Sequence, residues 1–291
     1  MLAPSLGRPQ LRFGREGFPQ VQILENQSAF AKPLRETPSP CDHSQFLHSE
    51  FREQNLHWFH ALYEGREKFD SLEEELAYRE AQSALSRSEA VQIKELLGLR
   101  AGQHILEVFC GNGRHSVILA RLGVRVVGLD LAKSRVAFAS RWAKDQDVPA
   151  FFLVGDAANL PVRAKLQAVL ILGGSFSHMA DWETDLGFLR ELRGLLTPGG
   201  KLLIDNPNPV RFWSLQNPQG QLPKPEELPW FDLPLNSSQG PGRVRYWGAR
   251  SISIMLAQAG FVKVKVLGDR QGSPYTSQSP RLVSIGRAPG L

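Results

Sequence analysis

The stretch Ile105-Leu-Glu-Val-Phe-Cys-Gly-Asn-Gly-Arg-His115 is a short apolar run that leads into two closely spaced glycines. A helical pattern of apolar residues follows it and stops at Gly123. This order predicts a β-strand, a glycine turn and an α-helix. Glycine in such a turn lets the backbone approach a ligand closely, because it has no side chain and tolerates positive φ. We therefore expect an α/β fold that binds a ligand at this turn.

A second apolar run, Val124-Arg-Val-Val-Gly-Leu-Asp130, ends on a carboxylate about 17 residues after Gly113. In a nucleotide-binding α/β unit, a carboxylate at this place binds ribose hydroxyls. A dinucleotide motif needs a third glycine, but Ser116 holds that place, and the lysine of a P-loop is also missing. The two strands predict a different adenosine-containing cofactor, and the alternative is an ordinary strand-turn-helix without a ligand.

Glu107 precedes the glycines, and the turn then resembles the first motif of class I S-adenosylmethionine-dependent methyltransferases, an acidic residue followed by G-x-G-x-G. Phe109 stands where the family's first glycine usually lies, whereas Gly111 and Gly113 keep the other two places. Because these two remain, the resemblance implies that cofactor binding is retained, with the Phe109 ring packed against the methionine part.

Later segments resemble the same family in the same order and extend the likeness over roughly residues 44–290. Gly155-Asp-Ala-Ala-Asn-Leu-Pro161 is similar to its G-D-A-x-x-L-P motif, and Leu196-Thr-Pro-Gly-Gly200 is similar to the motif before its fifth strand. Leu166-Gln167 replaces the F-D pair that usually begins the fourth strand. The run from Gly268 to Leu282 resembles the tail of many family members.

The resemblance implies an α/β fold with a doubly wound, seven-stranded, mostly parallel sheet, a C-terminal antiparallel hairpin and added N-terminal helices. This is the Rossmann-like methyltransferase fold. We expect a flexible arm over 1–43, an N-terminal helical cap over 44–97 and a methyltransferase core over 98–291, with an insertion at 206–246. Functional loops concentrate at such insertions, and its aromatic residues suggest a partly apolar substrate pocket. A partly disordered insertion is the alternative.

The implied activity is transfer of a methyl group from S-adenosyl-L-methionine to a small-molecule acceptor by in-line displacement. The alternative is an RNA-directed methyltransferase, or a catalytically inactive relative that binds RNA or the cofactor. Asn206-Pro-Asn-Pro209 is similar to the N-P-P-Y signature of enzymes that methylate exocyclic amines of bases. That signature belongs after the fourth strand, where this chain has Gly173-Gly-Ser-Phe176, so a nucleic-acid acceptor is disfavoured.

The resemblance also implies roles for individual residues. Glu107 would help to hold the methionine amine and Asp130 the ribose hydroxyls, while Asp156 and Ala157 would hold the adenine and Leu131 would pack on its ring. The full predicted cofactor-binding set is Glu107, Phe109, Cys110, Gly111, Asn112, Gly113, Asp130, Leu131, Asp156, Ala157, Leu172 and Gly173.

A general base is needed only if the acceptor atom must lose a proton. His178 follows the predicted fourth strand and is the first candidate for that role. Asp205 at the end of the fifth strand and His115 near the glycine turn come next. A histidine in such a loop is more often structural, and this alternative stays open for His178.

Composition and charge limit the possible partners, metals and cellular compartment of the protein. The 291 residues carry a formal net charge of +5, and residues 200–291 contribute eleven basic and five acidic side chains. A basic face can attract nucleic acid or an anionic substrate, although a solvated surface is more common. Cys41 and Cys110 form no metal pattern and suit a reducing compartment, so we expect a cytoplasmic protein without a metal. We also expect no signal peptide and no membrane span, and the oligomeric state is open.

Overall fold

The computed structural model describes residues 22–23, 69, 71–178, 181–217, 219–220, 223–224, 227–237 and 240–290. Most of the predicted arm and the first part of the predicted cap lie outside these residues. Within the arm, β1 (Gln22–Ile23) pairs with β5 (Val162–Arg163) in an antiparallel ladder. The proposed division into arm, cap and core therefore stays a prediction.

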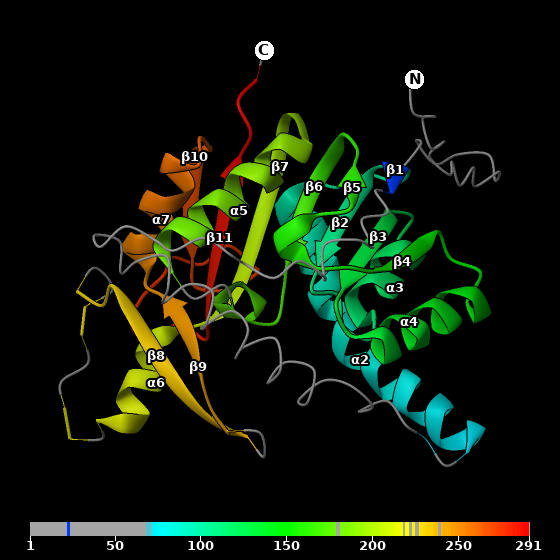
Figure 1. Cartoon of the computed structure of the whole chain (residues 1–291), viewed down its shortest axis with the longest axis horizontal. Coiled ribbons are helices and arrows are strands. Elements are labelled where there is room, and N and C mark those ends of the chain that lie inside the picture. The colour runs from blue at the N-terminus through cyan, green and yellow to red at the C-terminus, as the bar shows by residue number, and fades with distance from the viewer. Residues whose placement is uncertain are drawn as a thin grey trace, which may run out of the picture.

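A seven-stranded sheet with the order β10-β11-β7-β6-β2-β3-β4 forms the centre of the described chain (Figure 1). The strands β7, β6, β2, β3 and β4 run parallel, and β11 is antiparallel to both of its neighbours. Their bounds are β2 His104–Val108, β3 Arg125–Asp130, β4 Ala150–Val154, β6 Leu166–Ile171, β7 Leu196–Pro207, β10 Val262–Leu267 and β11 Arg281–Arg287. The predicted doubly wound sheet with its C-terminal antiparallel hairpin is confirmed.

Helices cover both faces of this sheet (Figure 1). On β6, Ala168 and Leu170 belong to the apolar cluster that includes α2 and α3, whereas Val169 and Ile171 belong to the cluster that includes α5 and α7. A strand buried on both faces reads as a continuous apolar run, which is why the sequence revealed it. The helices are α2 Leu72–Leu97, α3 Arg114–Arg121, α4 Lys133–Asp145, α5 Trp182–Leu195 and α7 Ala249–Gln258. None of the described helices is long and apolar enough to cross a membrane.

The described part of the predicted helical cap forms the helix α2. The Ser71 side chain accepts a hydrogen bond from the Glu74 amide at its start, and Gly98 ends it with φ 63°. Such caps satisfy backbone groups that have no partner inside the helix. Arg79 of α2 is buried and donates to Asp145 of α4 at 2.6 Å. This ion pair helps to hold α2 beside α4.

The insertion at 206–246 contains α6 (Pro209–Gln216) and a hairpin of β8 (Trp230–Ser237) and β9 (Gly240–Trp247). The Phe212 ring stacks at 5.0 Å on Tyr246 and at 6.2 Å on Phe231, which joins α6 to the hairpin. The predicted end of the insertion at 246 falls inside β9, because Tyr246 and Trp247 close this strand and α7 begins at Ala249.

Candidate cofactor site

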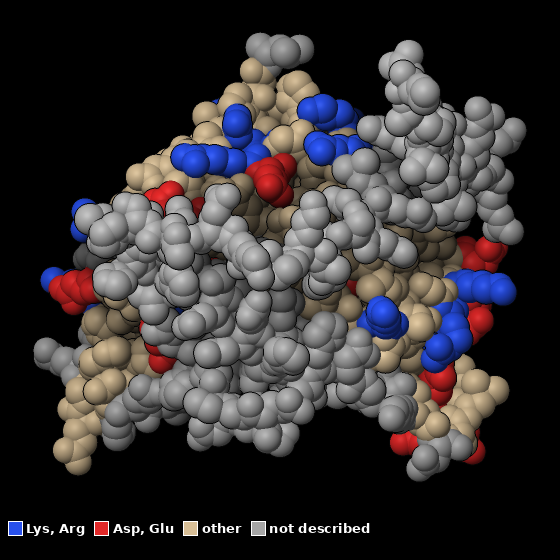
Figure 2. Space-filling view, in the orientation of Figure 1, with Lys and Arg blue, Asp and Glu red and all other residues tan. Residues whose placement is uncertain are grey.

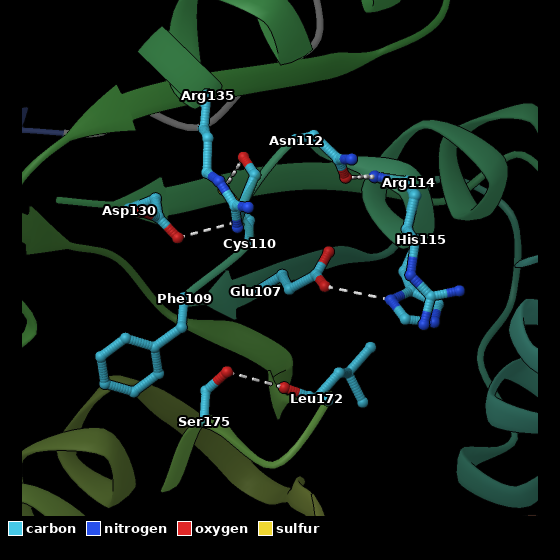
Figure 3. A pocket seen from close by; sticks show the side chains of 12 residues that line it. Glu107, Phe109, Cys110, Asn112, Arg114, His115, Asp130, Arg135, Leu172 and Ser175 are labelled. Atoms are coloured by element: carbon cyan, nitrogen blue, oxygen red, sulfur yellow. Dashed lines mark hydrogen bonds and ion pairs between the residues drawn. The ribbon is translucent and has the colours of Figure 1, made fainter. Parts of the chain in front are cut away.

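A pocket of about 280 Å³ opens where β2, β3 and β6 end and α3 begins (Figure 3). Ligands of doubly wound sheets bind at this edge, beyond the carboxyl ends of the strands. The lining residues are Glu107, Phe109, Cys110, Gly111, Asn112, Arg114, His115, Asp130, Arg135, Leu172, Gly173 and Ser175.

The turn between β2 and α3 contains three residues with positive φ: Phe109 at 61°, Gly111 at 55° and Gly113 at 78°. Gly113 precedes the first turn of α3, where a Cβ would lie 2.7 Å from Ala139 Cβ and 2.8 Å from Phe152 Cζ. Glycine is needed at Gly113 because α3 packs closely on α4 and β4. Gly113 is not among the residues that line the pocket, and its predicted contact with the cofactor stays a prediction.

Phe109 occupies the place of the family's first glycine and adopts the left-handed conformation that favours glycine. Its half-buried ring lies 6.1 Å from the Phe188 ring, with an interplanar angle of 60°. The ring therefore contacts α5, and Phe109 also lines the pocket, while its predicted contact with the methionine part stays a prediction. This contact with the core offsets part of the strain at positive φ.

Asp130 joins the end of β3 to the glycine turn. Its Oδ2 accepts a hydrogen bond from the Gly111 amide at 2.8 Å, and its Oδ1 accepts one from the Ala132 amide at 2.9 Å. Burial raises the pKa of Asp130, while the two amides and the charge of Arg135 oppose that rise. Each carboxylate oxygen can accept more than one hydrogen bond, so this pocket-lining group can also bind hydroxyls.

Glu107 and His115 form a buried polar pair at the other side of the pocket (Figure 3). Glu107 accepts a short hydrogen bond from Ser116 Oγ, and its Oε1 lies 3.6 Å from His115 Nδ1. Ser116, which replaces the third glycine of a dinucleotide motif, thus holds the acidic residue of the first motif. The second ring nitrogen, Nε2, lies 2.7 Å from Glu89 Oε2. Burial alone would lower the pKa of His115, but the two carboxylates raise it above its usual value.

The pocket brings together most of the predicted cofactor residues. Those that line it are Glu107, Phe109, Cys110, Gly111, Asn112, Asp130, Leu172 and Gly173. Gly113, Leu131, Asp156 and Ala157 lie outside the lining, and their roles stay predictions. Asp156 Oδ1 accepts from the Ala158 amide at 2.9 Å and caps the short 3₁₀ helix η1 (Ala157–Asn159).

Sequence reasoning missed four lining residues: Arg114, Arg135, Ser175 and, as a cofactor residue, His115. Arg114 and His115 directly follow the glycine turn, so adjacency was an available signal. Arg135 lies in the first turn of α4, and a Cβ on Gly111 would be 3.3 Å from its Nη1. Its place in the pocket follows from the fold and not from a motif.

The candidate bases differ in what surrounds them. His178 ends the 3₁₀ helix η2 (Ser175–His178), beyond β6, but its side chain lies outside the described residues and its role stays a prediction. Asp205 is fully buried and binds Arg281 Nε at 2.7 Å as well as Arg270. Burial and the nearby Asp130 raise the pKa of the Cys110 thiol, which disfavours the thiolate that a nucleophile needs. No group of three His, Cys, Asp or Glu residues in the described chain is arranged to hold a metal.

Residues 105–200 match the family model of a methyltransferase domain. The glycine N-methyltransferase of Rattus norvegicus is 31% identical over 141 residues, which are 42% of this chain and 48% of that protein. A probable S-adenosylmethionine-dependent methyltransferase of Mycolicibacterium smegmatis is 28% identical over 173 residues, 60% of this chain and 57% of that protein. The chain thus spans about half the length of the curated relatives it matches.

Solved structures share the fold at low sequence identity. The CcbJ methyltransferase of Streptomyces caelestis has a TM-score of 0.55 at 19% identity and covers 70% of this chain and 90% of its own. The glycopeptide N-methyltransferase MtfA in complex with S-adenosyl-L-methionine has a TM-score of 0.53 at 18% identity and covers 70% and 94%. Residues 105–200 are thus similar to a methyltransferase domain, and the described chain has the fold of solved S-adenosylmethionine-dependent methyltransferases.

Proposed function

We propose that this protein transfers a methyl group from S-adenosyl-L-methionine to a small-molecule acceptor. The observation that carries the proposal is Asp130, a buried carboxylate bonded to the Gly111 amide at the rim of a pocket beyond the parallel strands. When bound, S-adenosyl-L-methionine supplies a methyl group on a positively charged sulfur, which is activated for in-line displacement. The task of the protein is then mainly to position the two reactants.

The lining residues fit the parts of this cofactor. Asp130 has accepting capacity left for the ribose hydroxyls, and Glu107 carries the negative charge that favours a cationic amine and sulfur. Gly173 has φ 72°, and apart from its chain neighbours no atom of the described residues lies within 4 Å of the position that its Cβ would take. This open backbone lets a ligand approach the end of β6.

The acceptor is proposed only as a small molecule. Relatives that match part of this chain are named for glycine, the cypemycin N-terminus and demethylmenaquinone, which differ widely in size and polarity. The Gly174 Cβ position would lie 3.5 Å from Tyr246 Cε1, so the aromatic insertion reaches the end of β6. This contact supports an acceptor site between the insertion and the pocket, with partly apolar character.

The described residues narrow the choice of base. His115 faces two carboxylates that favour its protonated form, and Asp205 is held by two arginines, so neither suits proton abstraction. His178 remains the candidate base for an acceptor that must lose a proton. A neutral amine acceptor already presents a lone pair and needs no base before the methyl transfer.

Calorimetry with S-adenosyl-L-methionine and S-adenosyl-L-homocysteine tests the proposal. Asp130→Asn keeps the shape of the side chain but removes its charge, and we expect binding to weaken by about 10- to 100-fold, as for a lost charge-assisted hydrogen bond. Asp147→Asn is the matched control, because Asp147 is exposed and lies before β4 at the opposite end of the sheet. If neither compound binds the unaltered protein, or if both variants bind equally well, the assignment fails.

A metabolite screen for release of S-adenosyl-L-homocysteine would then identify the acceptor. Amines and hydroxyl compounds tested in parallel separate the two kinds of acceptor atom. An RNA-directed activity would instead appear as RNA binding that falls steeply with salt concentration.

A further inference from the structure

Glu89 lies on α2 outside the pocket, yet it contacts side chains from two other segments. Its Oε2 is 2.7 Å from His115 Nε2 and 2.8 Å from Arg114 Nη1, and its Oε1 is 2.8 Å from Arg270 Nη1. Arg114 and His115 line the pocket, whereas Arg270 follows β10. One carboxylate therefore joins α2 to the pocket wall and to the C-terminal part of the chain.

The contacts continue beyond Glu89 on both sides. His115 Nδ1 faces Glu107 Oε1 at 3.6 Å, and Arg270 Nη2 lies 2.5 Å from Asp205 Oδ2. Charges of opposite sign thus alternate from the end of β2 to the end of β7. We call this set the Glu89 network; its members are Glu107, His115, Arg114, Glu89, Arg270, Asp205 and Arg281.

The surroundings of Glu89 keep it charged. Burial raises its pKa, but the hydrogen bond with His115 and the charges of Arg114, His115 and Arg270 outweigh that effect and hold the pKa well below the usual range. His115 is faced by Glu107 from β2, Glu89 from α2 and the adjacent Arg114 from its own helix. Because a carboxylate lies at each ring nitrogen, the ring makes both contacts as a donor only in its doubly protonated form.

A second contact ties α2 to the pocket. Asn112, in the glycine turn, donates from Nδ2 to Tyr78 Oη at 2.7 Å. Arg114 also donates from Nη1 to Ser86 Oγ at 2.9 Å, one helical turn before Glu89. The same face of α2 therefore contacts the turn at several points, with Glu89 as the charged one.

We propose that Glu89 is a positioning residue of the cofactor pocket, which holds Arg114 and a positively charged His115 at the pocket wall and so couples the docking of α2 to cofactor binding. The inference rests on the proposed function for its ligand. Glu89 acts through His115, which in turn faces Glu107 inside the pocket. Without the Glu89 charge, Arg114 and Arg270 lose their shared anion, and His115 keeps only one carboxylate partner.

The test uses Glu89→Gln in the full-length chain, with two readouts. In the ligand-free protein, an NMR titration of the His115 ring should give a pKa lower than in the unaltered protein by about one unit or more, since one of two carboxylates is gone. Calorimetry should give an affinity for S-adenosyl-L-homocysteine that is weaker by about tenfold, within the range for residues coupled in one ion-pair network. That affinity should also decline as pH rises through the His115 pKa of the variant, because the ring then loses its positive charge.

Two further variants separate the proposed role from a general loss of structure. Glu95→Gln makes the same chemical change at an exposed position of α2 and should leave both readouts unchanged. Glu89→Asp keeps the charge with a shorter reach and should keep the His115 pKa close to that of the unaltered protein, even where Glu89→Gln folds poorly. The proposal is overturned if Glu89→Gln leaves the His115 pKa and the affinity unchanged. It is also overturned if Glu89→Asp lowers the His115 pKa as much as Glu89→Gln does, because the charge would then not be what holds the ring. If the unaltered protein binds no S-adenosyl-L-homocysteine, the proposed function fails, and the ligand-free titration still decides on the network.

Discussion

Phe109 carries a bulky side chain at a backbone conformation that suits glycine, with φ 61°. For a residue with a Cβ, the left-handed region costs about 1–2 kcal/mol. Its half-buried ring recovers stability through apolar contacts with the core, including Phe188. At this position, where the family usually has a glycine, the chain accepts a strained backbone and gains the packing of an aromatic ring. Both effects on the free energy of unfolding can be measured by substituting this one residue.

Two substitutions at Phe109 separate the strain from the packing. Phe109→Ala loses the ring but keeps the strained Cβ, whereas Phe109→Gly loses the ring and relieves the strain. We expect both to unfold more easily than the unaltered protein, and Phe109→Gly to be the more stable of the two by up to about 1 kcal/mol. Urea denaturation measures both free energies of unfolding.

The same pair at Phe151 is the control, because Phe151 is exposed on β4 and has no positive φ. There the order should reverse, with alanine more stable than glycine by about 0.5–1 kcal/mol. If the two Phe109 variants were equally stable, or if the alanine and glycine variants ranked in the same order at both positions, Phe109 would not be under backbone strain.

Gly113 shows the limit of motif reasoning for single residues. The sequence predicted it as a residue that binds the cofactor, which stays a prediction, and the structure adds a packing reason for glycine: a Cβ there would meet Ala139 on α4 and Phe152 on β4. Those residues are distant in sequence, so the spacing of the motif could not reveal them. The prediction for Asp130 rested on its place at a strand end, and the structure puts it in the pocket.

At the scale of elements, α5 and β9 are joined by a buried hydrogen bond in which Trp247 Nε1 donates to Asp185 Oδ2 at 2.5 Å. Asp185 is 1% exposed, and its Oδ1 has no hydrogen-bond partner among the described residues. Burial raises the pKa of Asp185 well above its usual value, although Trp247 and the charge of Arg245 oppose the rise. Asp185 therefore favours its protonated form in the folded protein.

This raised pKa predicts a pH-dependent effect of Asp185→Asn. A carboxyl whose folded pKa is raised stabilises the fold fully below its unfolded pKa, near 4, and loses that contribution as pH rises through the folded pKa. The variant cannot ionise, so its free energy of unfolding relative to the unaltered protein should increase from about pH 4 to pH 7, by more than about 1 kcal/mol.

The slope with pH is the test, because the buried amide adds a cost that does not change with pH. Glu183→Gln, at an exposed position in the first turn of α5, should show no comparable slope. Urea denaturation at several pH values measures both, and a flat difference for Asp185→Asn would refute the assignment.

The parallel strands could be predicted because burial on both faces leaves an unbroken apolar run, as in β6. The end of the insertion could not be predicted from the sequence, because its aromatic residues are compatible with a helix and with a strand. In the structure Trp247 pairs with Trp230 of β8, and its side chain bonds to Asp185, 62 residues away in sequence. The Glu89 network was also not predicted, because it depends on contacts between residues that are distant in sequence: Glu89 and Arg270 are 181 residues apart.

At the scale of the whole molecule, none of the described basic residues of 200–291 is among those that line the pocket. On the face in Figure 2, Lys and Arg side chains of the described surface gather where β7 begins and again over α4. Arg270 and Arg281 bind Asp205, and Arg245 binds Asp232, so part of this positive charge neutralises carboxylates of the same chain.

The pocket joins parts of the chain that are distant in sequence, so a ligand bound there should stabilise the whole fold. At a concentration of 100 times its Kd, S-adenosyl-L-homocysteine should add about 2.7 kcal/mol to the free energy of unfolding. For a chain of this length each kcal/mol raises Tm by about 2–4 °C, so we expect a shift of about 5–10 °C in a thermal melt.

The comparison ligand is NAD⁺, which shares the adenosine part but has a pyrophosphate where the methionine would lie. The glycine turn has Ser116 in the place of the third glycine, and Ser116 Oγ is bonded to Glu107. A pyrophosphate would therefore bring its negative charges toward a carboxylate, and NAD⁺ should leave Tm nearly unchanged. If NAD⁺ raised Tm more than S-adenosyl-L-homocysteine does, the pocket would be a dinucleotide site, and the argument from the charge of Glu107 would be wrong.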